Sequence, residues 1–139
     1  MQIPLLVAVA IPYMALEFAW LGGMIPRIYA PLFARVQGTK SWQKRPTREI
    51  VAAAVVAYAL LVSGMAYFAL ENDPSRMSYG SAATRGAFLG FLVYGTYNLT
   101  NYVAFDAWGV GLGMLDTAWG TFVVATVSVI AKLLRELIK

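Results

Sequence analysis

Residues 50–70 read IVAAAVVAYALLVSGMAYFAL, a run of 21 residues without a charged side chain. A helix needs about 20 mostly apolar residues to cross the hydrocarbon core of a bilayer. This stretch is apolar all round and lacks the alternation of a barrel strand, so it predicts a transmembrane helix. The same pattern recurs three more times along the chain.

The three further stretches with the length and apolar character of a membrane span are residues 3–23, 84–104 and 111–131. The chain is 60% hydrophobic and only 13% charged, whereas a soluble globular domain is roughly 45–50% apolar and about 25% charged. The connection over residues 105–110 is so short that the last two spans must form an antiparallel hairpin. We therefore predict an all-α membrane protein in which residues 1–139 form one domain, with four transmembrane helices in an up-down bundle.

The composition also excludes several kinds of chemistry. The chain has no cysteine and no histidine, so it lacks thiolate ligands, a cysteine nucleophile, the commonest metal ligand and the usual neutral-pH general base. We predict no cofactor, and the one metal chemistry that stays open is a carboxylate-only site for a hard cation. The net charge of +4 comes from basic residues that flank apolar spans, which favours lipid phosphates over nucleic acid as partners.

The connection over residues 24–49 is long and basic. Apolar side chains recur every four positions at Ile28, Leu32 and Val36, which indicates a short interfacial helix, while two prolines in the same stretch favour a plain basic loop equally. By the positive-inside rule we expect this loop on the cytoplasmic or equivalent side of a bacterial inner membrane or an organelle membrane. Its six basic residues are candidates for contact with anionic lipid headgroups: Arg27, Arg35, Lys40, Lys44, Arg45 and Arg48.

Polar side chains interrupt the first, third and fourth predicted helices at a similar depth. Glu17 lies six residues before the end of the first span, Asn98 six before the end of the third, and Asp116 five after the start of the fourth. At 1.5 Å per residue each lies about 8–9 Å below the same membrane surface. We therefore expect Glu17, Asn98 and Asp116 to form one polar cluster.

Helical periodicity extends this predicted cluster. Residues 94, 98 and 101 recur on one stripe of the third span, residues 97 and 101 form a second pair, and Trp119 faces with Asp116 on the fourth. Trp20 and Trp108 lie on the same side of the membrane and are typical of an interfacial aromatic belt. The candidate binding residues are Glu17, Tyr94, Tyr97, Asn98, Thr100, Asn101, Asp116 and Trp119.

Small residues indicate where helices approach each other. Gly86 and Gly90 form a small-xxx-small pair in the third span, and such pairs let two helix backbones come close. On the fourth span Gly120 would leave room beside the carboxylate of Asp116.

Three motifs carry a resemblance to a known family. They are LEFAWLG at residues 16–22, YNLTN at residues 97–101 and LDTAWG at residues 115–120. In order and spacing the chain resembles, over nearly its whole length, a family of small four-helix membrane proteins of unknown function. The family's motif in the third helix is Tyr-Asp-Leu-Thr-Asn, so Asn98 stands where a carboxylate is usual, and Glu17 stands in place of the usual Asp. The resemblance implies no reaction.

Three functions remain open from the sequence. A Glu17–Asn98–Asp116 network with one carboxylate protonated would cross-link helices, which is typical of a structural or accessory subunit of a larger membrane complex. The same groups would suit a small transporter or carrier that binds a cation, a proton or a polar solute. A lipid- or quinone-active enzyme is the third possibility, and the lack of a nucleophile–base pair at a recognisable spacing argues against an enzyme.

Overall fold

The computed structural model describes residues 3–40, 45–71 and 73–138. Every regular element in these ranges is a helix and none is a strand, which confirms the predicted all-α class. Two of the helical segments are π-helical turns and one is a single 3-10 turn. In chain order the elements are α1 (Ile3–Met24), η1 (Ile25–Tyr29), α2 (Ala30–Val36), α3 (Thr47–Gly64), η2 (Met65–Ala69), η3 (Pro74–Arg76), α4 (Tyr79–Ala104) and α5 (Val110–Leu137).

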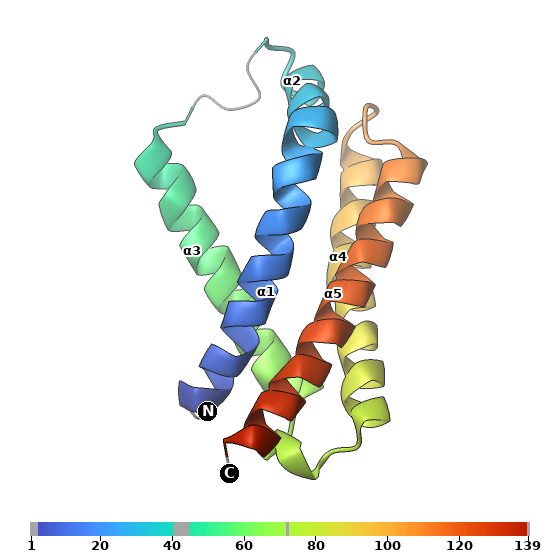
Figure 1. The fold of residues 1–139 in the computed structure, drawn as a ribbon. Helices are drawn as coiled ribbons and strands as arrows, with labels where there is room; N and C mark the ends of the chain where they lie inside the picture. The colour runs from blue at the N-terminus through green and yellow to red at the C-terminus, as the bar shows by residue number, and fades with distance from the viewer. Residues whose placement is uncertain (1–2, 41–44, 72, 139) are drawn as a thin grey trace.

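The first helix is longer than the apolar pattern predicts. α1, η1 and α2 follow one another without a break (Figure 1), so that helical structure continues past residue 23 to Val36. Pro26 and Pro31 are the second residues of η1 and α2, and because proline has no N–H, each leaves one carbonyl of the preceding turn without its helical partner. The π-helical turn shifts the hydrogen-bond register between them. Gly38, whose φ is +62°, adopts the left-handed conformation that typically follows a helix end.

α4 and α5 form a closely packed antiparallel hairpin (Figure 1). A Cβ atom added at Gly90 would lie 2.3 Å from the carbonyl oxygen of Gly120, and one added at Gly86 would lie 2.7 Å from that of Val124. The two backbones therefore lie in contact at these glycines, with the Ser128 hydroxyl also close to Gly86. This is the close approach that the Gly86/Gly90 pair predicts.

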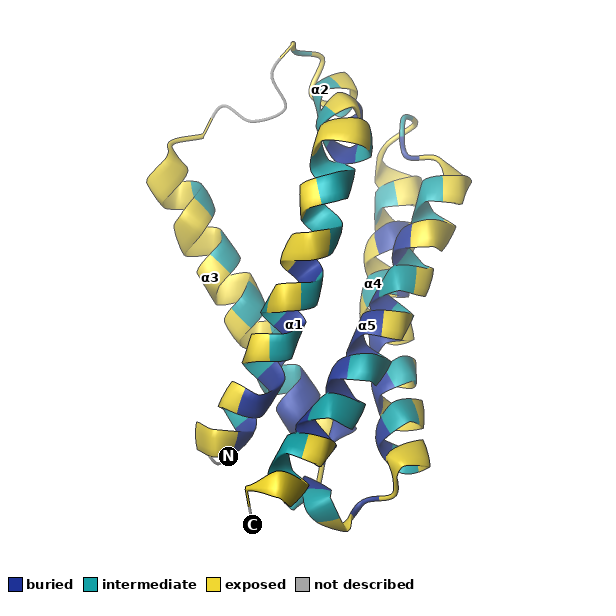
Figure 2. Ribbon diagram, in the orientation of Figure 1, coloured by how far each residue is buried: buried dark blue, intermediate teal, exposed yellow. Residues whose placement is uncertain are grey.

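The other two long helices pack less evenly. α1 lies against α5, whereas α3 joins the molecule mainly through its C-terminal end and η2, and it diverges from α1 toward the α2 end (Figure 1). Buried residues follow this arrangement in Figure 2, along the inner faces of α1, η2 and α5, while most of α3 is exposed. The centre of the apolar core is formed by Val9, Tyr13, Met65, Val123 and Val127.

The helical segments that are long and apolar enough to cross a membrane are Ile3–Val36, Thr47–Ala69 and Val110–Leu137. α4 has 26 residues, but its glycines and the polar run at 97–101 make it less apolar than these three. Large apolar side chains on the outer surface, such as those of Leu60 and Phe122, have more than half of their area exposed. A surface of this kind suits contact with lipid tails and agrees with the predicted membrane protein.

The contact at Gly90 provides a test of this packing. We expect Gly90→Ala to lower the free energy of unfolding by about 1–3 kcal/mol, because the new Cβ would overlap the backbone of Gly120 and force the helices apart. The measurement is the unfolding midpoint in detergent, followed by tryptophan fluorescence. Gly22→Ala is the control, since its Cβ would meet nothing within 4 Å. Equal midpoints for the two variants would contradict the close approach of α4 and α5.

Candidate functional site

The side chains of Asn98 and Asp116 meet within the α4–α5 hairpin, about two helical turns from the connection between the two helices. Asn98 Nδ2 donates a hydrogen bond of 2.7 Å to Asp116 Oδ2 and a second of 2.9 Å to the carbonyl oxygen of Tyr94. Trp108, just before α5, donates from Nε1 to Asn98 Oδ1 over 3.2 Å. Both polar residues are almost fully buried, with 3% of Asn98 and 6% of Asp116 exposed. The amide therefore supplies the carboxylate with a donor that an apolar span would otherwise deny it.

Glu17 is held one helical turn away from this pair. Its Oε1 accepts a hydrogen bond from the Tyr94 hydroxyl on α4 and another from Trp119 Nε1 on α5, both of 2.9 Å. The Tyr94 hydroxyl also lies 2.8 Å from that of Tyr13 on α1. Tyr94 precedes Asn98 by one turn and Trp119 follows Asp116 by one turn, so Glu17 is joined to the Asn98–Asp116 pair through its neighbours and not directly.

Two residues of the site were not recognised from the sequence. The Tyr29 hydroxyl in η1 donates a hydrogen bond to Asp116 Oδ1, and Trp108 supports Asn98 as described above. Tyr29 lies in the connection over residues 24–49, which the sequence leaves open between a short interfacial helix and a basic loop, while the first span is predicted to end at residue 23. Trp108 was assigned to the interfacial belt, although it is 2% exposed. The recurrence of Ile28, Leu32 and Val36 was the one signal that the helix continues to Tyr29.

Close packing of aromatic rings fixes the donors of this network. The rings of Trp20 and Trp119 stack with their centroids 4.4 Å apart and their planes 5° apart. A Cβ added at Gly120 would lie 2.0 Å from Cγ of Tyr94. The absence of a side chain at Gly120 thus lets the Tyr94 ring cross α5 and bring its hydroxyl to Glu17. From the sequence we expect the missing side chain of Gly120 to leave room beside the Asp116 carboxylate. In the structure the Tyr94 ring occupies that room.

Other residues of the YNLTN motif lie outside the hydrogen-bonded network. Thr100 is exposed, and its hydroxyl donates to the carbonyl oxygens of Thr96 and Tyr97 within α4, each over 2.9 Å. Tyr97 is 47% exposed and packs edge-on against Trp108 with ring centroids 5.7 Å apart. Asn101 is partly buried, one turn nearer the α4 end than the Asn98–Asp116 pair. Of the predicted residues, the structure brings together Glu17, Tyr94, Asn98, Asp116 and Trp119.

A cavity of about 510 Å³ lies beside the network, between α1, α3 and α4. Its wall consists of seven aromatic side chains, six aliphatic ones and the carboxylates of Glu17 and Asp116, and none of these described lining residues is a lysine or an arginine. Helix α3 contributes Tyr58 and Leu61 together with two alanines. The two acidic groups thus share one largely apolar, aromatic cavity.

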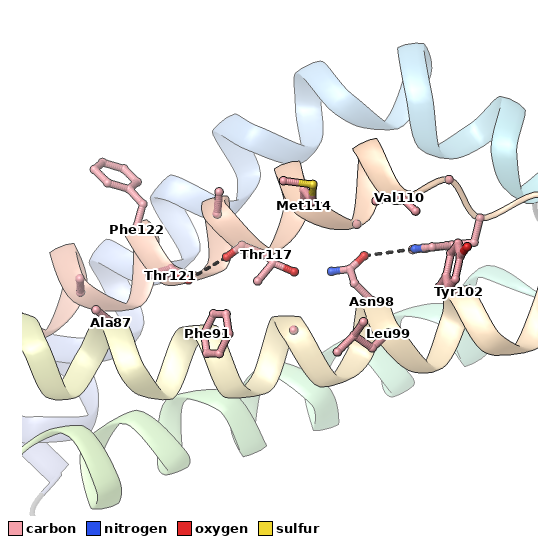
Figure 3. Close-up of a pocket in the computed structure, with 16 residues that line it drawn as sticks. Ala87, Phe91, Asn98, Leu99, Tyr102, Val110, Met114, Thr117, Thr121 and Phe122 are labelled. Atoms are coloured by element: carbon pink, nitrogen blue, oxygen red, sulfur yellow. Dashed lines mark hydrogen bonds between the residues drawn. The ribbon is translucent and has the colours of Figure 1, made fainter.

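A second hollow of about 730 Å³ lies on the other side of Asn98, between α4 and α5. Figure 3 shows Phe91 and Leu99 on α4 and Met114 and Thr117 on α5 among the residues that line it, with the Asn98 side chain between the two helices. Its lining contains no acidic or basic residue. This hollow is a largely apolar groove between α4 and α5.

The predicted lipid-binding residues gather at the end of the molecule where α2 ends and α3 begins. Arg27, Arg35, Lys40, Arg45 and Arg48 are all exposed, and Lys44 lies outside the described residues. Arg27 donates a hydrogen bond of 2.9 Å to the carbonyl oxygen of Gly23, and Arg45 forms a long ion pair of 4.0 Å with Glu49. Basic side chains with this exposure are suited to lipid phosphates.

Removal of the Asn98 amide tests its role as a donor. We expect Asn98→Leu to destabilise the protein by about 1–3 kcal/mol, because Asp116 would stay buried with one donor fewer. Thermal unfolding in detergent measures the effect. Thr100→Val is the matched control from the same motif and is expected to change stability by less than about 0.5 kcal/mol. An Asn98→Leu protein as stable as Thr100→Val would rule out the amide as a stabilising partner of Asp116.

Similarity to a known family supports the interpretation of this chain as a membrane protein. No curated protein and no solved structure matches the chain. A family model described as "Predicted membrane protein (DUF2177)" matches residues 2–133, which is nearly the entire chain. This match confirms the resemblance indicated by the three motifs. The chain belongs to this DUF2177 family of predicted membrane proteins.

Proposed function

We propose that this protein is a small membrane carrier that binds a cation at Glu17 and Asp116. The main observation in support is that both carboxylates line one cavity that has no basic side chain among its described lining residues. None of the ion pairs in the described part of the chain includes either acid. An acidic group within a membrane span needs a compensating partner. A bound cation would provide it.

The hydrogen bonds at Glu17 leave room for such a ligand. Both of its donors, Tyr94 and Trp119, bind to Oε1. Oε2 accepts no hydrogen bond from a described residue, and Glu17 belongs to the cavity wall. A cation in the cavity would therefore meet a carboxylate oxygen that is already held in position. Binding and release of a cation break no covalent bond, so we propose that the protein is not an enzyme.

We propose that the chain crosses the membrane four times, as an up-down bundle of helices. α3 ends near the chain termini, whereas α5 begins at the opposite end of the molecule (Figure 1). If α3 and α5 both cross the membrane, α4 must carry the chain back across it, although its polar residues make it less apolar. We propose that the end with exposed basic residues, near Arg35 and Arg45, faces the cytoplasm or its equivalent and contacts anionic lipids.

Single-cysteine labelling tests this topology, since the chain has no cysteine of its own. We expect Thr39→Cys and Asp106→Cys to react with a membrane-impermeant maleimide from one side of the membrane, and Ser75→Cys from the other. Labelling of intact and permeabilised cells measures the side. Reaction of positions 75 and 106 from the same side would exclude α4 as a span. Protection of position 75 together with labelling of position 39 in intact cells would reverse the proposed orientation.

An accessory subunit of a larger membrane complex is the second candidate function. The observation in its favour is that donors from other helical segments already hold both carboxylates: Tyr29, Tyr94, Asn98 and Trp119. In that case the acids would set the helix arrangement and no ligand would be needed. Extraction in a mild detergent distinguishes the two candidates, because a subunit would migrate in a complex of constant composition and a carrier would migrate alone.

Current measurements on proteoliposomes test the carrier directly. After concentration jumps of Na⁺, K⁺, H⁺ or an organic ammonium ion, we expect the wild type to give a cation-dependent current for at least one of them. Glu17→Gln and Asp116→Asn should each reduce that current at least about tenfold, because each removes a negative charge from the cavity.

The control for this experiment is Glu49→Gln, which removes an exposed carboxylate that is not part of the cavity wall and should leave the current unchanged. The carrier proposal fails if no cation gives a current, or if the two cavity variants conduct like the wild type.

A further inference from the structure

We infer that the cation is an organic ammonium ion with an apolar body, and not a metal ion. This inference rests on the proposed function and names the class of its ligand. It follows from three properties of the cavity between α1, α3 and α4: its size, its lack of a metal-ligand set, and the aromatic surface around its two acids.

The size of the cavity fits a small organic molecule. Its volume of about 510 Å³ lies within the range of roughly 300–1,000 Å³ that is usual for small-molecule sites. A bare metal ion would occupy a small fraction of this space. Most of the wall is hydrocarbon or aromatic ring, which would not replace the water that a hydrated ion has to shed.

The polar groups available do not make a metal site. Ca²⁺ takes six to eight oxygen ligands, and Mg²⁺ six in near-octahedral geometry. In the described part of the chain no three acidic residues lie together as metal ligands. The hydroxyls of Tyr29 and Tyr94 are engaged with the two carboxylates. Glu17 Oε2 is thus an acceptor suited to one cationic group, not one member of a coordination shell.

Two pairs of aromatic rings in the cavity wall form what we call the aromatic cage. Tyr58 on α3 packs against Tyr13 on α1 with ring centroids 6.0 Å apart and planes at 66°, and Tyr29 stacks with Phe33 at 6.0 Å and 16°. All four rings line the cavity. An alkylated ammonium group is attracted to such ring faces, and loses less hydration there than a metal ion would.

Tyr58 belongs to this cage and takes no part in the hydrogen-bonded network. Its hydroxyl makes no hydrogen bond to a described residue, and it lies on α3, in which Val62 is the one buried residue. Its ring can therefore be changed without removing a donor from Glu17 or Asp116. Substitutions at Tyr58 can therefore change ligand binding while the hydrogen bonds between the helices remain.

Calorimetric titration of the protein in lipid nanodiscs tests the inference. The probe is benzyltrimethylammonium, and the comparison ligands are Na⁺, K⁺ and 3,3-dimethyl-1-butanol, which has a similar branched head without the charge. We expect saturable binding of the ammonium probe only. Glu17→Gln and Tyr58→Leu should each weaken it about tenfold, and Tyr58→Phe should recover most of what Tyr58→Leu loses, because it restores the ring. Glu49→Gln should bind like the wild type.

The outcomes separate this inference from the function on which it rests. Binding of Na⁺ or K⁺ that depends on Glu17, without binding of the ammonium probe, would overturn the ligand class and leave the carrier standing. Equal binding of the ammonium probe and the neutral alcohol, or no binding that depends on Glu17, would overturn both. If Glu17→Gln does not fold, as judged by gel filtration and thermal unfolding, the Tyr58→Leu and Tyr58→Phe pair decides the inference.

Discussion

The structure depends on the need of two acidic side chains for hydrogen-bond donors inside apolar helices. Glu17 and Asp116 are at most 6% exposed, and an acid at membrane depth is stable only with partners. The donors come from other elements: Tyr94 and Asn98 from α4, Trp119 from α5 and Tyr29 from η1. Satisfying the two acids therefore requires α1, η1, α4 and α5 to occupy fixed positions relative to one another.

Two other features of the chain follow from this requirement. The first helix has to continue through η1, because a helix ending at residue 23 would leave Asp116 without Tyr29. The backbones of α4 and α5 have to touch, because only then does the Tyr94 ring lie over Gly120 and reach Glu17. Glycine and proline, which often interrupt helices, are here the residues that allow the network to form.

The sequence was sufficient for the features that depend on composition and spacing. The apolar runs predict the helices, the short connection before Val110 predicts the α4–α5 hairpin, and the Gly86/Gly90 pair predicts its close contact. Counting residues from the span ends brought Glu17, Asn98 and Asp116 into one region. In the structure Glu17 lies one helical turn away from the Asn98–Asp116 pair, whereas the count places all three at one depth. The count assumes straight helices that are perpendicular to the membrane.

Other features depend on tertiary contacts that no local pattern encodes. Tyr29 became part of the site only because a π-helical turn carries the helix past Pro26. Trp108 has the composition of an interfacial residue, and its burial against Asn98 depends on how the hairpin closes. The divergence of α3, which leaves the cavity open, arises from packing along one end of that helix only.

The central claim is that donors on neighbouring helices stabilise the buried acids, and a double-mutant cycle tests it most directly. The variants are Glu17→Met, Tyr94→Phe and their combination, and the measurement is the free energy of unfolding in nanodiscs. We predict a coupling energy between about 0.6 kcal/mol, the average for interhelical hydrogen bonds in a membrane, and about 1.7 kcal/mol, the largest value found for them. A coupling energy of zero, with the two single effects simply adding, would contradict the account.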